Sequence, residues 1–340
     1  MQAVVMLVCN DFRDDARVQR QANTLLDQGL EVSVLAQRSN RAASPRERTE
    51  SGLSVRRLSV PFNTQWRFVP FVKKILNSAV LIPKLFLCMC LHHRDHVIHA
   101  HDLDALLPAV LTSKIFKNKV IYDAHELITE RATYRWLSPI LGLLEAYCCK
   151  QVACVVTTTN SRAHFLAKKY GITPPKVVPN LPVHRDVMPS RKIEETLNIL
   201  DNQPIAIYQG RLHEGRGIRT IINLAQRIPS LHFVLIGEGP QQSLVDEAAL
   251  SSAHRNIYRI PWLPQHQLHE FTCSADIGLQ LIRNTCANHY TTDSNKLFEY
   301  ISAGLAVLAS DFPEISATVE QYKVGKVCDP EDLDALTRTL

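Results

Sequence analysis

The sequence predicts an α/β protein with two doubly wound, Rossmann-like domains in tandem. Short runs of β-branched residues alternate with longer segments of helical period, which is the pattern of a parallel sheet with crossover helices. A polar stretch marked by prolines interrupts this alternation between Val178 and Pro204, and the alternation then starts again. The 340 residues suit two domains of ordinary size. Because ligands of such folds bind beyond the carboxyl ends of the strands, we expect a ligand-binding cleft between the domains.

Each half of the chain contains its own set of expected elements. In the first half, strands are expected at 3–9, 31–36, 54–60, 96–100, 119–123, 152–157 and 176–178. Helices are expected there at about 15–28, 70–92, 103–116, 137–150 and 160–170. In the second half, strands are expected at 205–209, 232–236, 256–260, 276–280 and 306–309, with a helix from about 218. The predicted domains are 1–183 and 204–340, joined by a linker at 184–203.

Composition narrows the class of protein. Hydrophobic residues make up 46% of the chain and charged residues 21%, which excludes a disordered chain. The net charge of +5 is too mild for nucleic-acid binding and fits an anionic small molecule or membrane surface. The nine cysteines form no CxxC pair, which predicts reduced thiols in a cytosolic protein. The apolar N-terminus has no basic leader or small-residue cleavage site, so we interpret it as a strand.

The strand expected at 205–209 runs into a loop that suits a diphosphate. Residues 210–217 contain three glycines together with Arg211 and Arg216, and a helix follows. Glycines let the backbone approach phosphate, a helix N-terminus offers free N–H groups, and guanidiniums neutralise phosphate oxygens. A solvated basic loop is the alternative. Gly237 also follows directly after an expected strand, as Gly210 does. Taken alone it is weaker evidence for a phosphate site, because a glycine after a parallel strand is often only a tight turn.

A second candidate nucleotide-binding motif lies at 293–310. Asp293 or Ser294 can cap a helix, which places Glu299 between one and two turns into it. A carboxylate there can accept paired hydrogen bonds from a diol such as a ribose, with the helix N-terminus facing phosphate. The alternative is that Lys296 and Glu299 form an ordinary surface pair three residues apart.

These motifs, taken in order, resemble family 4 of the retaining glycosyltransferases, which have the GT-B fold. The second half matches through Gly-Arg-x4-Arg-Gly, Ile-Gly-x-Gly-Pro, Ser-Ala-Asp-Ile-Gly-Leu and Asn-Lys-Leu-Phe-Glu-Tyr-x3-Gly-Leu. The first half matches through Asp-x-Arg-Val from Asp15, His-Ala-His-Asp from His99, Tyr-Asp-Ala-His-Glu from Tyr122 and Val-Pro-Asn from Val178. The resemblance covers nearly the whole chain.

The resemblance implies a nucleotide-sugar site in the second half. Arg211 and Arg216 would hold the donor diphosphate, although the family usually has lysine at the second position. Glu299 would hold the ribose. A glutamate that often contacts the donor sugar is replaced here by Thr291, so that contact falls to Asp293 or to backbone N–H groups of 288–294. The full set of expected donor-binding residues is Gly210, Arg211, Arg216, Gly237, Asp293, Asn295, Lys296 and Glu299.

The resemblance also implies a reaction centre in the first half. His125 matches a histidine that faces the donor sugar, so the expected catalytic residues are His125, Arg211 and Arg216. A structural hydrogen bond is the alternative for His125. His101 and Asp102 are expected to line the acceptor side, and His99 to be packed. Asp11, Arg13 and Arg17 are expected to contact acceptor or phosphate, with a solvated loop as the equal alternative.

The resemblance implies a retaining, metal-independent glycosyltransferase that moves a hexosyl or related group from a nucleoside-diphosphate sugar to a glycan or lipid-linked acceptor. The expected setting is cell-surface polysaccharide or glycolipid synthesis. Positioning and leaving-group stabilisation would supply the catalysis, with no cofactor besides the donor. The Asp-x-Asp pairs at Asp102 and Asp332 are expected to be helix-start acids rather than metal ligands.

Three other functions are weighed. A nicotinamide-dependent oxidoreductase would need Gly-x-Gly-x-x-Gly after the first strand, and residues 9–17 contain no glycine. A nucleotide-sugar 2-epimerase of the same fold and a catalytically inactive nucleotide-sugar-binding protein both stay open. Chains of the family usually continue into a last helix that crosses back to the first domain, and we expect this chain to lack it.

The segment 66–94 combines basic, aromatic and aliphatic residues. Its apolar run is interrupted by Asn77, Pro83 and Lys84, which argues against a membrane span. An interfacial helix on the inner face of the cytoplasmic membrane and a helix packed on its own sheet explain the pattern equally well.

Overall fold

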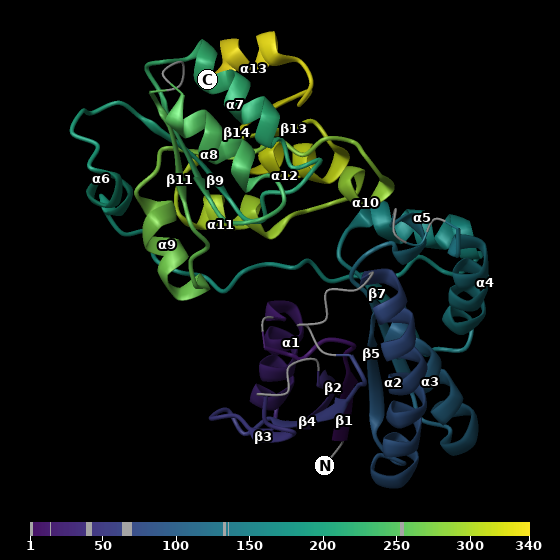
Figure 1. The fold of residues 1–340 in the computed structure, drawn as a ribbon. Helices are drawn as coiled ribbons and strands as arrows, with labels where there is room; N and C mark the ends of the chain where they lie inside the picture. The colour runs from purple at the N-terminus through teal and green to yellow at the C-terminus, as the bar shows by residue number, and fades with distance from the viewer. Residues whose placement is uncertain are drawn as a thin grey trace. The chain divides into compact units, whose positions relative to one another are not determined.

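The chain folds into two α/β units, each with its own sheet. The computed structural model describes residues 3–13, 15–38, 43–62, 70–131, 134, 136–251 and 255–340. The chain divides between Val178 and Pro179 (Figure 1). The predicted pair of doubly wound domains is confirmed. The cleft between them stays a prediction.

The first unit contains an eight-stranded sheet in the order β3-β4-β2-β1-β5-β6-β7-β8. All neighbours are parallel except β3 and β4. The strands are β1 (Ala3–Leu7), β2 (Glu31–Arg38), β3 (Arg46–Arg48), β4 (Ser54–Ser59), β5 (Val97–His101), β6 (Val120–Ala124), β7 (Cys154–Thr157) and β8 (Lys176–Val177). The helices are α1 (Ala16–Asp27), α2 (Pro70–His92), α3 (Asp102–Phe116), the 3-10 turn η1 (Ile128–Glu130), α4 (Ser138–Cys149) and α5 (Asn160–Tyr170).

The second unit contains a six-stranded parallel sheet in the order β11-β10-β9-β12-β13-β14. The strands are β9 (Ile205–Gln209), β10 (His232–Ile236), β11 (Ile257–Ile260), β12 (Ile277–Gln280), β13 (Ala306–Ser310) and β14 (Gly325–Cys328). The helices are α6 (Lys192–Leu197), α7 (Ile218–Arg227), α8 (Gln242–Leu250), α9 (Gln265–Cys273), α10 (Ala287–Tyr290), α11 (Asn295–Ser302), α12 (Pro313–Tyr322) and α13 (Leu333–Thr339). Helix α6 lies within the segment predicted as a linker.

Both faces of the second sheet are buried, which explains the continuous apolar runs in its strands. Along β9, Ile205 and Ile207 face one core cluster, whereas Ala206 and Tyr208 face the other. The side chain of Ile193, on α6, is buried in the first of these clusters. All nine cysteines are free thiols, as predicted.

Each strand and helix expected by range is present, with ends that agree to within two residues. The two strands that were not predicted lie at sheet edges. β3 has the sequence Arg-Glu-Arg and lacks the β-branched signal, so only its pairing with β4 reveals it. Asp102 and Asp104 lie in the first turn of α3, and Asp332 caps α13, which confirms them as helix-start acids.

Candidate active site

The loop after β9 packs closely against its neighbours, and its glycines make this possible. Gly217 has a φ of 78°, and a Cβ atom there would lie 2.1 Å from the carbonyl oxygen of Leu281. A Cβ atom on Gly237 would lie 1.9 Å from the carbonyl oxygen of Gly210. The two glycine turns are therefore stacked on each other at the carboxyl ends of β9 and β10.

Lys296 lies in the first turn of α11 and is buried beside this loop. Its Nζ lies 3.9 Å from the centre of the Tyr208 ring, and a Cβ atom on Gly210 would lie 3.6 Å from it. Burial and the nearby charge of Arg216 hold the pKa of Lys296 well below its usual range, while Glu299 opposes this shift. Two basic side chains thus meet at the carboxyl end of β9, and an anion placed between them would favour the protonated form of Lys296.

Glu299 lies one turn further along α11 and is held by a residue that the sequence did not single out. The amide of Gln209, at the end of β9, donates to Glu299 Oε2 at 2.6 Å. The Gln209 side-chain oxygen in turn accepts from the hydroxyl of Thr272 at 2.8 Å. This chain of hydrogen bonds fixes the carboxylate and leaves its other oxygen for a further donor. The sequence signal that could have identified Gln209 is a polar residue at the end of the apolar run Ile205–Tyr208.

The structure thus groups Gly210, Arg216, Lys296 and Glu299. Lys296 is buried, which disfavours the surface-pair interpretation. The side chain of Arg211 is exposed, and its carbonyl oxygen accepts from the Tyr208 hydroxyl at 2.8 Å.

The remaining donor-site candidates occupy the approach to α11. Asp293 and Thr291 are buried, and Asn295 is exposed. Ser294 takes the N-cap position, although its side chain makes no capping hydrogen bond. The roles of all these residues stay predictions.

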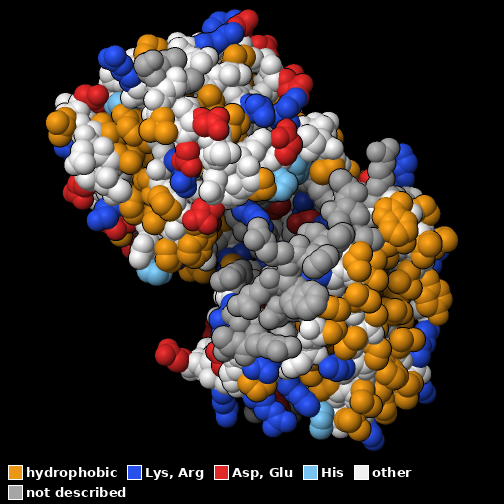
Figure 2. All heavy atoms as spheres, in the orientation of Figure 1, with side chains coloured by type: hydrophobic (Ala, Val, Ile, Leu, Met, Phe, Trp, Pro, Cys, Tyr) orange, Lys and Arg blue, Asp and Glu red, His pale blue; other side chains and the backbone are white. Residues whose placement is uncertain are grey.

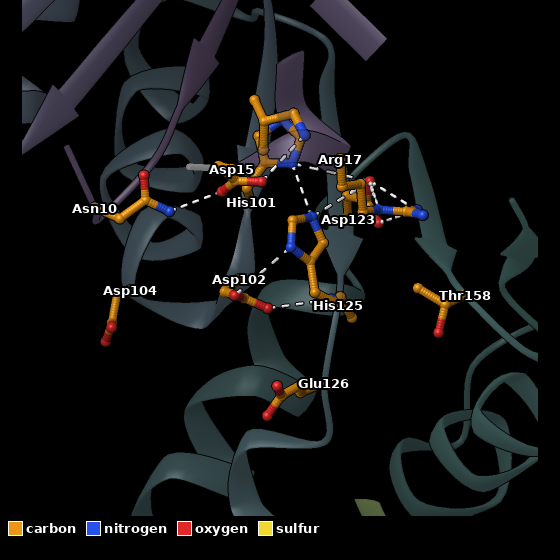
Figure 3. Close-up of polar contacts among 12 residues, drawn as sticks. Asn10, Asp15, Arg17, His101, Asp102, Asp104, Asp123, His125, Glu126 and Thr158 are labelled. Carbon is orange, nitrogen blue, oxygen red and sulfur yellow. Dashed lines mark hydrogen bonds and ion pairs between the residues drawn. The ribbon is translucent and has the colours of Figure 1, made fainter. Parts of the chain in front are cut away.

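In the first unit, three of the predicted residues meet at the ends of β5 and β6 (Figure 3). His101 and Asp123 are register partners on these strands. His101 Nδ1 lies 3.1 Å from His125 Nε2, which is 3.6 Å from Asp123 Oδ2. The backbone N–H of His125 donates to Asp102 Oδ1 at 3.1 Å. Asp102 itself has a φ of 62°, a strained conformation for a residue with a side chain and a common feature of functional sites.

Asp123 is the fully buried centre of this group. Arg17 donates to both of its carboxylate oxygens, from Nη2 at 2.9 Å and from Nε at 3.2 Å, and Gln21 donates to Oδ2 at 2.7 Å. Burial alone would raise the pKa of Asp123, but His125 and Arg17 hold it well below its usual range. Asp123 and Gln21 were not singled out from the sequence, although Asp123 lies inside a motif that carried the resemblance. Arg17 was expected either to contact acceptor or phosphate or to lie in a solvated loop, and its burial against Asp123 excludes the solvated loop.

The histidines of this group differ in charge. Burial would lower the pKa of His125, but the carboxylates of Asp102 and Asp123 raise it to about 9. Burial lowers the pKa of His99 to about 4 and that of His101 well below its usual range. His125 is therefore a protonated donor at neutral pH beside a neutral His101. His99 is buried, as predicted.

His99, His101 and Asp123 also carry three ligand-type atoms that all lie within 4.8 Å of one another. A divalent cation there would share Asp123 with the guanidinium of Arg17. That fixed positive charge opposes metal binding at this carboxylate.

Asp11 and Arg13 lie in the loop between β1 and α1. Their side chains form no hydrogen bond or ion pair with His101, Asp102 or His125 among the described residues. The structure therefore does not bring them into the histidine group.

Two family models account for almost the whole chain. Residues 15–181 match a "Glycosyl transferase 4-like domain", and residues 189–340 match "Glycosyl transferases group 1". The chain belongs to the GT-B glycosyltransferases. The predicted glycosyltransferase activity follows from this membership.

Solved GT-B structures share the fold of this glycosyltransferase. Sucrose-phosphate synthase from Thermosynechococcus elongatus is 17% identical with a TM-score of 0.79, and the match covers 100% of this chain and 88% of that one. Anabaena HepE in complex with UDP is 14% identical with a TM-score of 0.72, covering 99% and 88%. A colanic acid biosynthesis glycosyl transferase, WcaI of Escherichia coli K12, is 22% identical over 147 residues. That match spans 42% of this chain and 36% of the length of WcaI.

Proposed function

We propose that this GT-B glycosyltransferase transfers a sugar, with retention, from a nucleoside-diphosphate sugar to a glycan or lipid-linked acceptor in cell-surface polysaccharide or glycolipid synthesis. The observation that carries the proposal is the buried Lys296 beside Arg216, at a glycine loop that opens a helix. Two basic side chains at such a loop suit a diphosphate, whose negative charge would favour the protonated form of Lys296. The structure of HepE with UDP and the match to WcaI support the donor class and the setting.

The proposed chemistry uses the residues on each unit in different ways. Arg211, Arg216 and Lys296 stabilise the charge that develops on the departing diphosphate, and Glu299 accepts hydrogen bonds from the ribose. His125, protonated at neutral pH, donates a hydrogen bond to the sugar or the leaving group. In a front-face displacement the departing diphosphate then removes the proton of the acceptor hydroxyl. These cations do the work that a metal does in other transferases, so we propose that the reaction needs none.

The proposal includes contact with the inner face of the cytoplasmic membrane. Of the predicted segment 66–94, residues 66–69 lie outside the described residues. By length and composition Val72–His92 could cross a membrane, with a mean hydropathy of 1.7. One side of α2 is nevertheless buried in its own domain through Leu81, Leu85 and Met89. These contacts favour a helix that lies on the membrane surface over one that spans it.

The opposite side of α2 is apolar and exposed, and so are stripes on its neighbours α3 and α4. Helix α2 packs on α3, and α3 packs on α4. Figure 2 shows hydrophobic side chains gathered over this part of the first unit. The large exposed hydrophobic residues there are Val72, Ile75, Leu76, Leu87, Leu91, Leu111, Ile115, Trp136, Ile140, Leu143 and Tyr147. Surfaces of this kind are typical of protein–membrane or protein–protein contact.

A thermal-shift screen tests the donor site. The full chain is melted with UDP, GDP, ADP and CMP and with their sugars, and we expect one base to raise the melting temperature. Glu299→Ala and Arg211→Ala should remove the shift, while Glu247→Ala, on the exposed side of α8, should keep it. An unchanged shift in both site variants refutes the site.

Product analysis separates the two alternative functions. With donor and a mixture of glycan and lipid-linked acceptors, a transferase forms a glycosylated product. A 2-epimerase changes the donor sugar without any acceptor, and an inactive binding protein changes neither. Either of the last two results overturns the transferase proposal.

A further inference from the structure

Three arginines project from one face of the β3–β4 hairpin at the edge of the first sheet. Arg46 and Arg56 are direct cross-strand partners, and Arg48 lies on the same face two positions along β3. Like charges directly opposite each other destabilise an antiparallel pair. An anion held between these guanidiniums would relieve that repulsion.

The arginines line two adjoining cavities between the hairpin and α2. Arg46 and Arg56 line both. The first cavity, of about 440 Å³, also includes Lys84, and the second, of about 600 Å³, also includes Arg48 and His92. The two cavities share these two arginines and are together called here the arginine groove.

The arginine groove carries almost no negative charge of its own. Among the described residues that line it, the only carboxylate belongs to Glu47, whose Oε2 accepts from Arg57 Nη1 at 2.6 Å. Arg57 is buried and also donates to two backbone carbonyls, so this pair has a structural role. Segments 39–42 and 63–69, outside the described residues, contain no Asp or Glu. The described lining of the groove therefore leaves its cations available to an anionic ligand.

The groove lies directly beside the exposed apolar side of α2. Lys84, Cys88 and His92 follow one another at intervals of four residues, which places them on one side of the helix, facing the hairpin. Burial raises the pKa of the Cys88 thiol, whereas the charges of Arg56 and Arg46 lower it, which is consistent with this placement. Leu87 and Leu91, on the adjoining side, are each 57% exposed.

We propose that the arginine groove binds the phosphate groups of anionic phospholipids while the apolar side of α2 rests in the bilayer interface beside it. Arginine pairs phosphate oxygens through two parallel hydrogen bonds, and cations beside an apolar helix face are typical of contact with anionic membranes. The absence of acidic residues from Pro70–His92 fits such a surface. The inference rests on the proposed membrane contact and adds a site that prefers anionic phospholipids to uncharged ones.

Vesicle co-sedimentation of the full chain tests the site. The vesicles contain phosphatidylcholine alone, or phosphatidylcholine and phosphatidylglycerol in equal amounts. Replacing Arg46, Arg48 and Arg56 together by Gln should weaken binding to the anionic vesicles about a hundredfold. The matched control replaces three exposed cations elsewhere, Lys168, Arg255 and Lys326, by Gln, which changes the net charge equally. Equal weakening by both triple variants overturns the site, because general charge would then explain the binding.

Two further arms separate the possible ligands. Leu87→Ser should weaken binding to both kinds of vesicle, since it removes apolar contact and no charge. If inorganic phosphate raises the melting temperature through the three arginines while vesicle binding ignores them, the groove binds free phosphate and the lipid proposal falls. Concentration-dependent dimerisation that Leu87→Ser abolishes, with no vesicle binding, assigns the face to a second copy and also overturns it.

The donor screen distinguishes this inference from the proposed function. The triple arginine variant should keep the full nucleotide-induced shift in melting temperature, since the groove lies in the other unit. A lost shift would mean that the variant has not folded or that the site assignment is wrong. An intact shift with unchanged anionic-vesicle binding rejects the lipid site alone.

Discussion

Arg17 and Asp123 lie 106 positions apart and form a fully buried, two-pronged ion pair. Asp123 is completely inaccessible, and Arg17 also donates to the carbonyl oxygen of Val178 at 2.9 Å. The pair therefore ties α1 to β6 and to the last residue of the first unit. It also holds the carboxylate that faces His125.

Arg17→Ala should destabilise the first unit strongly. Removing one partner of a buried ion pair leaves an uncompensated charge and typically costs about 3–5 kcal/mol. Urea denaturation followed by far-ultraviolet circular dichroism measures the loss. Arg13→Ala, an exposed change in the preceding loop, should cost less than about 0.5 kcal/mol. Similar losses in the two variants would contradict a buried pair.

Stability should fall as the pH rises through the pKa of His125. That pKa, about 9, lies above the ordinary value of 6.5, so the stabilisation is complete below pH 6.5 and disappears as the pH passes 9. The loss is on the order of 3 kcal/mol. His99 and His101 are already neutral in this window, and Asp123 stays charged.

Urea denaturation at several pH values measures this dependence in the wild type and in His125→Gln. The slope attributable to His125 should be missing from the variant. Equal slopes in the two proteins would show that the charge of His125 is not coupled to folding.

Donor binding should be accompanied by proton uptake at Lys296. Its pKa is depressed in the free protein by burial and by Arg216, and a bound diphosphate would raise it. At a pH between the two pKa values, the neutral amine of Lys296 therefore gains a proton on binding and becomes an ammonium. Calorimetry in buffers of different ionisation enthalpy measures the uptake. Lys296→Met should abolish it, and Lys168→Met, an exposed change, should not. A binding enthalpy independent of the buffer argues against the assigned site.

Gly217→Ala and Gly304→Ala form a matched pair in the second unit. The two glycines have nearly equal φ angles, 78° and 80°. An alanine at 304 would meet only methyl groups of Val187 at 3.5 Å, whereas one at 217 would press on the carbonyl oxygen of Leu281. The cost of a left-handed alanine, about 1–2 kcal/mol, is common to both. Gly217→Ala should therefore lose more stability and also weaken donor binding; equal losses in thermal denaturation would show that the loop can move aside.

The sequence alone determined the elements of this protein and their order. Apolar runs such as Ile205–Tyr208 extend over only a few positions, so they can be recognised without knowing the fold. The glycosyltransferase class was also identified from sequence, because each of its motifs is a short stretch and their order along the chain can be read directly. β3 was not predicted because its three charged residues have no strand preference. They form a strand only because they pair with β4.

Tertiary structure decided which side chains meet. Asp123 looked like an ordinary strand residue until Arg17, Gln21 and His125 converged on it from distant parts of the chain. Gln209 gained its role only when α11 brought Glu299 to the end of β9. The arginines of β3 and β4 line a common groove only because the two strands pair antiparallel and α2 packs beside them. Such contacts depend on the three-dimensional register of strands and helices, which local sequence pattern does not specify.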